Sequence, residues 1–153
     1  MTPYRTYPDC EIWNGNNVDV MREQLRDGAI DLTVTSPPYD DLRTYKTDQA
    51  MSELWSFNDV AEQLWRVTKQ GGMVVWIVAD ATSDGSESGT SFRQALRFME
   101  IGFLLHDTMI YETDKPPLTH NRYEQSFEYM FCFAKGKPST FNAIKRKATC
   151  AGH

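Results

Sequence analysis

The chain has 153 residues, of which 41% are hydrophobic and 24% are charged, as is typical of one globular domain with a hydrophobic core. Its formal net charge of −5 argues against a protein that binds nucleic acid through charge alone. No apolar run is long enough to cross a bilayer, and the polar N-terminus has no signal-peptide pattern. We therefore expect no membrane attachment and a cytoplasmic location.

The cysteines and the basic residues narrow the class of protein further. The three cysteines, Cys10, Cys132 and Cys150, are scattered and odd in number, so we expect neither a disulfide framework nor a metal site. Positive charge gathers after residue 134, where no acidic residue occurs. DNA therefore remains a possible partner if another basic module supplies the phosphate contacts.

The first predicted elements form a strand–helix–strand unit. Residues 11–15 are typical of a short strand, Asn17 can cap the helix that follows, and Asp27-Gly28 is a turn signal. Ile30–Thr35 is then a short apolar strand, which we expect to be buried. Because such crossovers build parallel sheets, the two strands are predicted to share one sheet.

A stiff turn follows this strand at Ser36-Pro37-Pro38-Tyr39. The two prolines fix two φ angles and remove two backbone donors, so the chain can neither continue as a helix nor pair onward. Ligands of open α/β sheets bind beyond the carboxyl ends of the strands. The turn places oxygen acceptors and an aromatic ring at such an end, which would suit the amino group of a flat heterocycle. Taken alone, the same four residues favour a proline-stiffened structural connection, because so short a motif carries little information.

The middle of the chain alternates helix and strand signals. Residues 40–48 are polar and are either a solvated loop or a flap beside a site, in which Arg43 and Tyr45 would meet a substrate. Residues 51–68 have the period of an amphipathic helix, which Gly71-Gly72 is expected to end. The most hydrophobic strand follows at 73–79, and Asp80 at its end is expected to cap the next helix or to face a cofactor.

The remaining elements are predicted as a helix over 92–99 ended by Gly102, a strand over 103–111 and a strand over 127–134. No internal repeat is visible. Between the two strands, the prolines and the run Asn121-Arg122-Tyr123 interrupt the regular pattern.

Two passages of the sequence resemble the amino-group DNA methyltransferases, which methylate N4 of cytosine or N6 of adenine. The first runs from Asp31 to Tyr39 and is similar to their strand and catalytic motif, Asp, Asn or Ser followed by Pro-Pro-Tyr or Pro-Pro-Phe. The second comprises Asn121-Arg122 and the run from Phe127 to Pro138. The resemblance covers roughly residues 12–142.

The resemblance implies an α/β, Rossmann-like methyltransferase fold, with a mostly parallel sheet, helices on both faces and an antiparallel C-terminal strand. It implies DNA as substrate, S-adenosylmethionine as cofactor and a flipped target base. The implied catalytic residues are Ser36, Pro37, Pro38 and Tyr39. The implied substrate-binding residues are Arg43, Tyr45, Asn121, Arg122 and Tyr123. Ser36 at the first motif position favours cytosine N4 over adenine N6.

The family's glycine-rich cofactor motif has no counterpart in residues 1–153, and no target-recognition region is evident. The whole chain is therefore interpreted as the catalytic portion of a permuted methyltransferase, in which the Ser-Pro-Pro-Tyr motif comes first. It would be a truncated product or one part of a two-chain enzyme, completed by a second chain or by self-association. The alternatives are a non-catalytic fragment that binds a partner chain or nucleic acid, and methyl transfer to RNA or to a glutamine amide.

Overall fold

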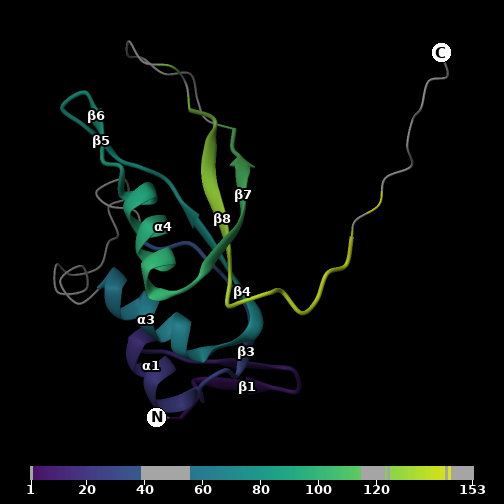
Figure 1. Ribbon diagram of the computed structural model, residues 1–153. Helices are drawn as coiled ribbons and strands as arrows, with labels where there is room; N and C mark the ends of the chain where they lie inside the picture. The colour runs from purple at the N-terminus through teal and green to yellow at the C-terminus, as the bar shows by residue number, and fades with distance from the viewer. Residues whose placement is uncertain (1, 39–55, 115–122, 124, 144, 146–153) are drawn as a thin grey trace, which may run out of the picture.

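The computed structural model describes residues 2–38, 56–114, 123, 125–143 and 145 (Figure 1). The elements are β1 (Arg5–Tyr7), β2 (Cys10–Ile12), α1 (Asn17–Gln24), β3 (Ile30–Thr35), α3 (Phe57–Val67), β4 (Thr68–Val78), β5 (Thr82–Ser83), β6 (Ser86–Glu87), α4 (Thr90–Ile101), β7 (Leu104–Glu112) and β8 (Phe127–Ala134). None of the helices described is both long and apolar enough to cross a membrane.

A four-stranded sheet in the order β3-β4-β8-β7 forms the centre of the molecule. β3 and β4 are parallel, while β8 runs antiparallel to both β4 and β7. The predicted α/β class and the antiparallel C-terminal strand are confirmed. β3, β4 and β7 point the same way and β8 alone runs against them, so the predicted mostly parallel sheet is confirmed for the described strands.

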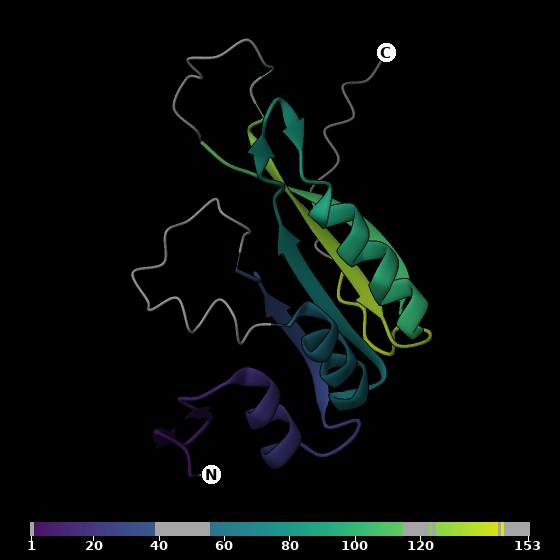
Figure 2. The ribbon, with the colours of Figure 1, turned by 90° about the vertical axis from the view of Figure 1, so that its left-hand side faces the viewer.

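The three helices that the structure describes, α1, α3 and α4, cover one face of this sheet (Figure 2). Successive side chains of β4 and β8 point to opposite faces of the sheet, and Trp76 and Phe133 point into a core shared with α3 and α4. Phe98 of α4 is fully buried there, with its ring 4.7 Å from that of Phe133 and 5.1 Å from that of Trp76. The second helical layer that the resemblance implies has no counterpart among the described residues.

The predicted N-terminal strand–helix–strand unit is also wrong in its pairing. β2 pairs antiparallel with β1 in a separate two-stranded sheet. Asn16, rather than Asn17, caps α1, and its side chain accepts a hydrogen bond from Val18 N at 2.9 Å. The composition of residues 11–15 indicated a strand correctly, but the partner of a short strand depends on the neighbouring chain, here the turn at residues 8–9.

Gly71 and Gly72 lie inside β4 rather than at a helix end. α3 ends at Val67, and β4 begins with the next residue. A Cβ at Gly72 would lie 2.9 Å from the Asp31 carbonyl oxygen, and one at Gly71 would lie 2.9 Å from Ser139 Cβ. The two glycines therefore permit close approach of neighbouring backbone. The prediction that they end a helix overlooked this tertiary role.

Asp80 caps α4, as predicted. Its Oδ1 accepts hydrogen bonds from Ser91 N at 2.9 Å and from Ser88 Oγ at 3.0 Å, and its Oδ2 accepts one from Ser91 Oγ. The N-cap residue of α4 is Gly89, which has no side chain, so the buried carboxylate of Asp80 satisfies the first turn instead.

Candidate active site

The Ser-Pro-Pro segment emerges from the carboxyl end of β3. Ile30–Thr35 forms a strand because its β-branched and aliphatic residues suit a pleated sheet next to β4, where Thr35 is level with Trp76. Pro37 is buried, whereas Ser36 and Pro38 are exposed. Since β4 is parallel to β3, its end at Asp80 lies on the same edge of the sheet.

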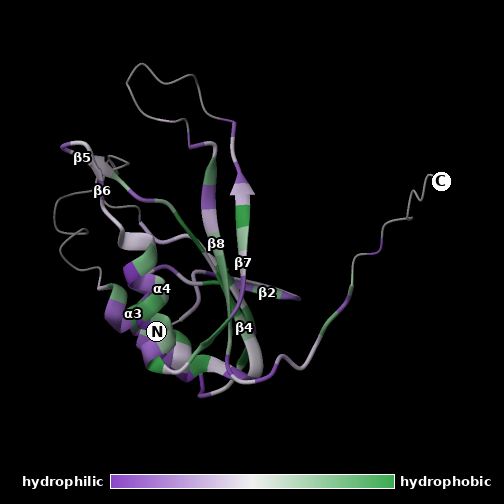
Figure 3. Ribbon diagram, turned by 45° about the horizontal axis from the view of Figure 1, so that its top comes forward, coloured by the Kyte–Doolittle hydropathy of each residue, from purple (hydrophilic) through white to green (hydrophobic). Residues whose placement is uncertain are grey.

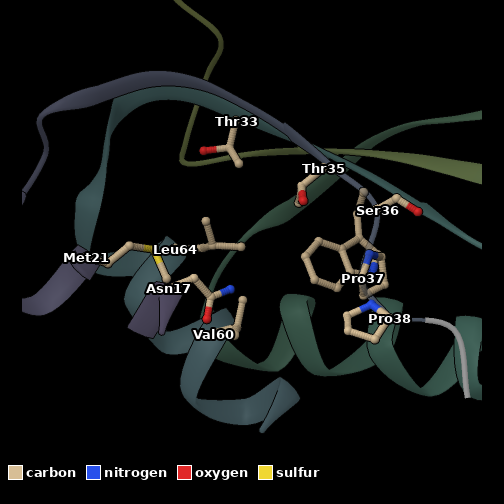
Figure 4. Close-up of a pocket in the computed structure, with 10 residues that line it drawn as sticks. Asn17, Met21, Thr33, Thr35, Ser36, Pro37, Pro38, Val60 and Leu64 are labelled. Carbon is tan, nitrogen blue, oxygen red and sulfur yellow. The ribbon is translucent and has the colours of Figure 1, made fainter. Parts of the chain in front are cut away.

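A cavity of about 220 Å³ lies directly beneath this segment (Figure 4). Its lining comes from five parts of the fold: α1, β3, the proline segment, α3 and β4. The lining residues are Asn17, Met21, Thr33, Thr35, Ser36, Pro37, Pro38, Val60, Leu64 and Trp76. Most of this surface is apolar, and its polar side chains are those of Asn17, Thr33, Thr35 and, at the rim, Ser36. This lining suits a small, mostly apolar group with a few hydrogen-bonding atoms.

The Trp76 wall of the cavity is held by a buried hydrogen bond. Its Nε1 donates to Gln94 Oε1 on α4 at 2.8 Å, and both side chains are buried. Phe57 and Phe98 pack edge-on against the indole at 5.8 and 5.1 Å. The ring beside Pro37 therefore has a defined orientation, which a functional pocket requires.

Arg66 of α3 holds α1 against the cavity. Its guanidinium donates to the carbonyl oxygens of Met21 at 2.7 Å and Leu25 at 2.9 Å, and to Asp27 Oδ1 at 2.6 Å. The carbonyl groups at a helix C-terminus lack partners and carry partial negative charge, so a cation is favourable there. The position of Asn17 and Met21 in the lining thus depends on an arginine outside the cavity.

The structure describes only part of the predicted site. Ser36 lies at the rim of the cavity, and Figure 4 shows its side chain pointing away from Val60 and Leu64. Tyr123 is fully exposed. Tyr39, Arg43, Tyr45, Asn121 and Arg122 lie outside the described residues. The geometry therefore presents the Ser36 oxygen on the outer side of the turn, and the predicted roles of all these residues remain predictions.

Sequence reasoning missed several residues of the cavity. Thr33 and Thr35 could have been found, because alternate residues of a strand share a face and these two lead directly into the motif. Gln94 and Arg66, which support the cavity from outside, gave no comparable signal, since their partners are 18 and 39 to 45 residues away.

Among the described residues, Cys132 has a perturbed pKa. Burial raises the pKa of its thiol above the usual value, and the nearby Asp107 raises it further.

Comparison with known sequences identifies relatives of this chain. The DNA methylase family N6_N4_Mtase matches residues 30–150. The orphan methyltransferase M.BamHII of Bacillus amyloliquefaciens is 58% identical over 125 residues, which cover 81% of this chain and 45% of M.BamHII. The type II methyltransferase M.BglII of Bacillus subtilis is 32% identical over 94 residues, which cover 60% of this chain and 24% of M.BglII.

Solved structures with the same fold also extend beyond the matched part. The PvuII DNA methyltransferase (cytosine-N4-specific) has a TM-score of 0.68 at 20% identity, over 84% of this chain and 50% of that one. TTHA0409 of Thermus thermophilus, complexed with S-adenosyl-L-methionine, has a TM-score of 0.60 at 20% identity, over 84% and 56%. The chain thus spans about half the length of these proteins. Since the family match takes in β3, the proline segment and the rest of the sheet, this chain belongs to the N6_N4_Mtase family of DNA methylases.

Proposed function

We propose that this chain is the base-binding part of a DNA amino methyltransferase of permuted order, with the Ser-Pro-Pro-Tyr motif first. The enzyme transfers a methyl group from S-adenosylmethionine to the exocyclic amino group of a flipped base, with cytosine N4 favoured over adenine N6. The observation that carries this proposal is the Ser36–Pro38 segment at the carboxyl edge of the sheet, where Pro37 is buried and Ser36 is exposed in a chain of the DNA methylase family.

In this proposal, the segment acts on a weak nucleophile. The amino nitrogen of cytosine or adenine is unreactive because its lone pair is delocalised into the ring. Ser36 Oγ and the Pro37 carbonyl oxygen would accept hydrogen bonds from its two N–H groups and so localise that lone pair. Preorganised acceptors need no rearrangement during the reaction, and the two prolines restrict the motion of the backbone that carries them.

Tyr39 would stack on the base after it leaves the duplex, a contact worth about 1–3 kcal/mol. Arg43, Tyr45, Asn121, Arg122 and Tyr123 would hold the flipped nucleotide or a nearby phosphate. The acceptors of this chain would hold the amino nitrogen in line with the methyl group that S-adenosylmethionine supplies when bound, and the amino proton would pass to water. This in-line displacement requires mainly alignment.

Three glycines of the described chain serve packing rather than a cofactor cradle. Gly71, Gly102 and Gly136 have positive φ angles, and a Cβ on each would meet Ser139, Trp65 or Gln70. These glycines serve the packing of this half of the fold. S-adenosylmethionine supplies the methyl group when bound, and we place its binding residues in the complementary half of the enzyme.

The alternative function is a non-catalytic part that associates with a partner chain or with nucleic acid. Leu32 and Val34 of β3, which are exposed on the sheet face opposite the cavity, favour association with protein. The two functions are compatible. Methyl transfer to DNA requires the complete fold, and association with a second polypeptide would complete it. A cytoplasmic location follows from DNA as substrate and belongs to the same proposal.

The test uses a chimera in which the 125 matched residues of M.BamHII are replaced by the corresponding residues of this chain. Purified chimera is incubated with labelled S-adenosylmethionine and duplex DNA, and the DNA is digested to nucleosides. The proposal predicts label in N4-methylcytosine. Label only in N6-methyladenine would contradict the choice of base, and a folded chimera that leaves DNA unlabelled, beside active M.BamHII, would contradict the function.

A further inference from the structure

Gln94 is a polar side chain on the buried side of α4. Hydrophobic and hydrophilic bands alternate along this helix (Figure 3), as expected of a helix packed on a sheet. Gln94 nevertheless lies on the same side as Ala95 and Phe98, and it is only 6% exposed. A buried amide is unfavourable unless it is hydrogen-bonded, so the partner of Gln94 indicates why this residue is in the core.

That partner is the indole of Trp76. Trp76 Nε1 donates to Gln94 Oε1 at 2.8 Å, and an indole has no second donor. Phe57 and Phe98 pack edge-on against the same ring, with centroid distances of 5.8 and 5.1 Å. The two phenylalanines limit where the indole lies, and the hydrogen bond fixes the direction of its N–H edge.

The indole connects Gln94 with the proline segment. Thr35 is level with Trp76 in the parallel pair β3–β4, and the segment begins at the residue after Thr35. Pro37 is buried and lines the same cavity as Trp76. The ring of a proline includes its own backbone nitrogen, so a displaced ring displaces the backbone with it. The carbonyl oxygen of Pro37 therefore keeps its place only while the Trp76 wall of the cavity keeps its own.

We infer that Gln94 is a positioning residue for methyl transfer. It holds the indole of Trp76 and thereby fixes the Pro37 carbonyl oxygen relative to Ser36 Oγ, the other acceptor of the function proposed above, on which this inference rests. Hydrogen bonds weaken steeply away from their ideal geometry, and a displacement of about 1 Å caused by a distant mutation can slow a reaction about 100-fold. Because Gln94 is not part of the cavity lining, it acts through Trp76 on the chemical step.

The test measures the single-turnover rate of methyl transfer to duplex DNA by the chimera with M.BamHII and by its Gln94→Leu variant. Both proteins are saturated with S-adenosylmethionine and DNA. We expect the variant to react about 10 to 100 times more slowly, with dissociation constants for DNA and cofactor within about twofold of those of the chimera. A rate equal to that of the chimera, or a loss confined to the two affinities, would overturn the inference.

Val67→Ala separates positioning from a general loss of core packing. Val67 is 1% exposed, ends α3 and lies outside the cavity lining. Its truncation leaves a void in the core but keeps the hydrogen bond between Trp76 and Gln94. We expect this variant of the chimera to react within about twofold of the unmodified rate, because its effects on distant sites are independent. Equal slowing by Val67→Ala and Gln94→Leu would overturn the inference.

Trp76→Phe removes the donor of the same hydrogen bond and should itself slow the reaction about tenfold. Adding Gln94→Leu should then slow the reaction by less than about twofold, because the bond is already absent. The double variant leaves no buried donor unpaired, so it carries the test even if Gln94→Leu alone does not fold. An unchanged rate of Trp76→Phe, or an undiminished effect of Gln94→Leu in its presence, would overturn the inference.

The outcomes separate this inference from the proposed function. An active chimera whose Gln94→Leu and Trp76→Phe variants react at the unmodified rate would overturn the inference and leave the function standing. A folded chimera that transfers no methyl group would contradict the function, and the inference would fall with it.

Discussion

Trp76 belongs both to the core and to the wall of the candidate site. It is almost fully buried, lines the cavity beneath Pro37 and donates its indole N–H to Gln94. A buried donor without a partner is costly, so Gln94 determines whether the indole can remain in this position. The stability of the core and the shape of the site therefore depend on the same hydrogen bond.

The first prediction concerns this bond. Gln94→Leu keeps the apolar packing of α4 but leaves the buried indole N–H unpaired, which should lower the free energy of unfolding by about 1–3 kcal/mol. Urea denaturation followed by tryptophan fluorescence measures the change. Arg93→Leu, at the exposed neighbouring position, should change it by less than about 0.5 kcal/mol. A stability of Gln94→Leu equal to that of Arg93→Leu would show that the bond does not matter.

Local chemistry was sufficient to predict the proline segment and the capping role of Asp80. Two consecutive prolines after Ile30–Thr35 must end the strand, and the structure places Ser36–Pro38 there. The cavity beneath them was not predictable in this way. It requires α1, α3 and β4 to meet, and contacts such as Arg66 with Met21 join residues 45 positions apart.

Among the secondary structure elements, α1 depends most on another element. It has no fully buried residue, and its C-terminal carbonyl groups are bound by Arg66 of α3. A helix of eight residues is marginal in isolation, so tertiary contacts must supply most of its stability. Asn17 and Met21 remain in the cavity lining only while this contact persists.

The second prediction is that Arg66→Ala loosens α1. Loss of each hydrogen bond from the charged guanidinium should lower the free energy of unfolding by no more than about 1.5–3 kcal/mol. It should also increase the rate of amide hydrogen exchange across residues 18–25. Arg97→Ala is the matched control, because Arg97 makes longer contacts, with Asn58 at 3.1 Å and Glu62 at 3.4 Å. Unchanged exchange in α1 of Arg66→Ala would contradict the role assigned to this arginine.

The strands with strong apolar patterns were predictable, and their pairing was not. β8 lies at the predicted residues 127–134, and the helix ended by Gly102 is confirmed. The pairing of β2 with β1 and the course of β4 through Gly71-Gly72 were missed, because both depend on neighbouring backbone. Residue types indicate whether a segment forms a strand, but the strand with which it pairs is visible only in the assembled sheet.

At the scale of the whole molecule, the described chain is a sheet with one covered and one open face (Figures 1 and 2). The resemblance of the sequence indicated the α/β class correctly. The restriction of the described helices to one face was not foreseen, because the sequence pattern of a strand shows which residues are apolar but not which layer covers them. The half-length matches to M.BamHII and the PvuII enzyme accord with this one-sided architecture.

The third prediction follows from the placement of the cofactor site. Chain 1–153 alone should show no micromolar binding of S-adenosylmethionine in titration calorimetry, because the family's glycine-rich cofactor motif has no counterpart in residues 1–153. The chimera with M.BamHII, measured under the same conditions, should bind the cofactor. Micromolar binding by the isolated chain would contradict the assignment of the cofactor site to the complementary half.

The central claim is that Ser36 activates the amino group of the target base. The measurement is the single-turnover rate of methyl transfer to duplex DNA by the chimera, its Ser36→Ala variant and its Ser83→Ala variant. Ser36 and Ser83 are both exposed, so neither change should disturb folding. If Ser36 is one of two preorganised acceptors, Ser36→Ala should lower the rate by about 10²–10³-fold while cofactor binding is retained. Ser83→Ala should react at the rate of the unmodified chimera, and an equally fast Ser36→Ala variant would contradict the account.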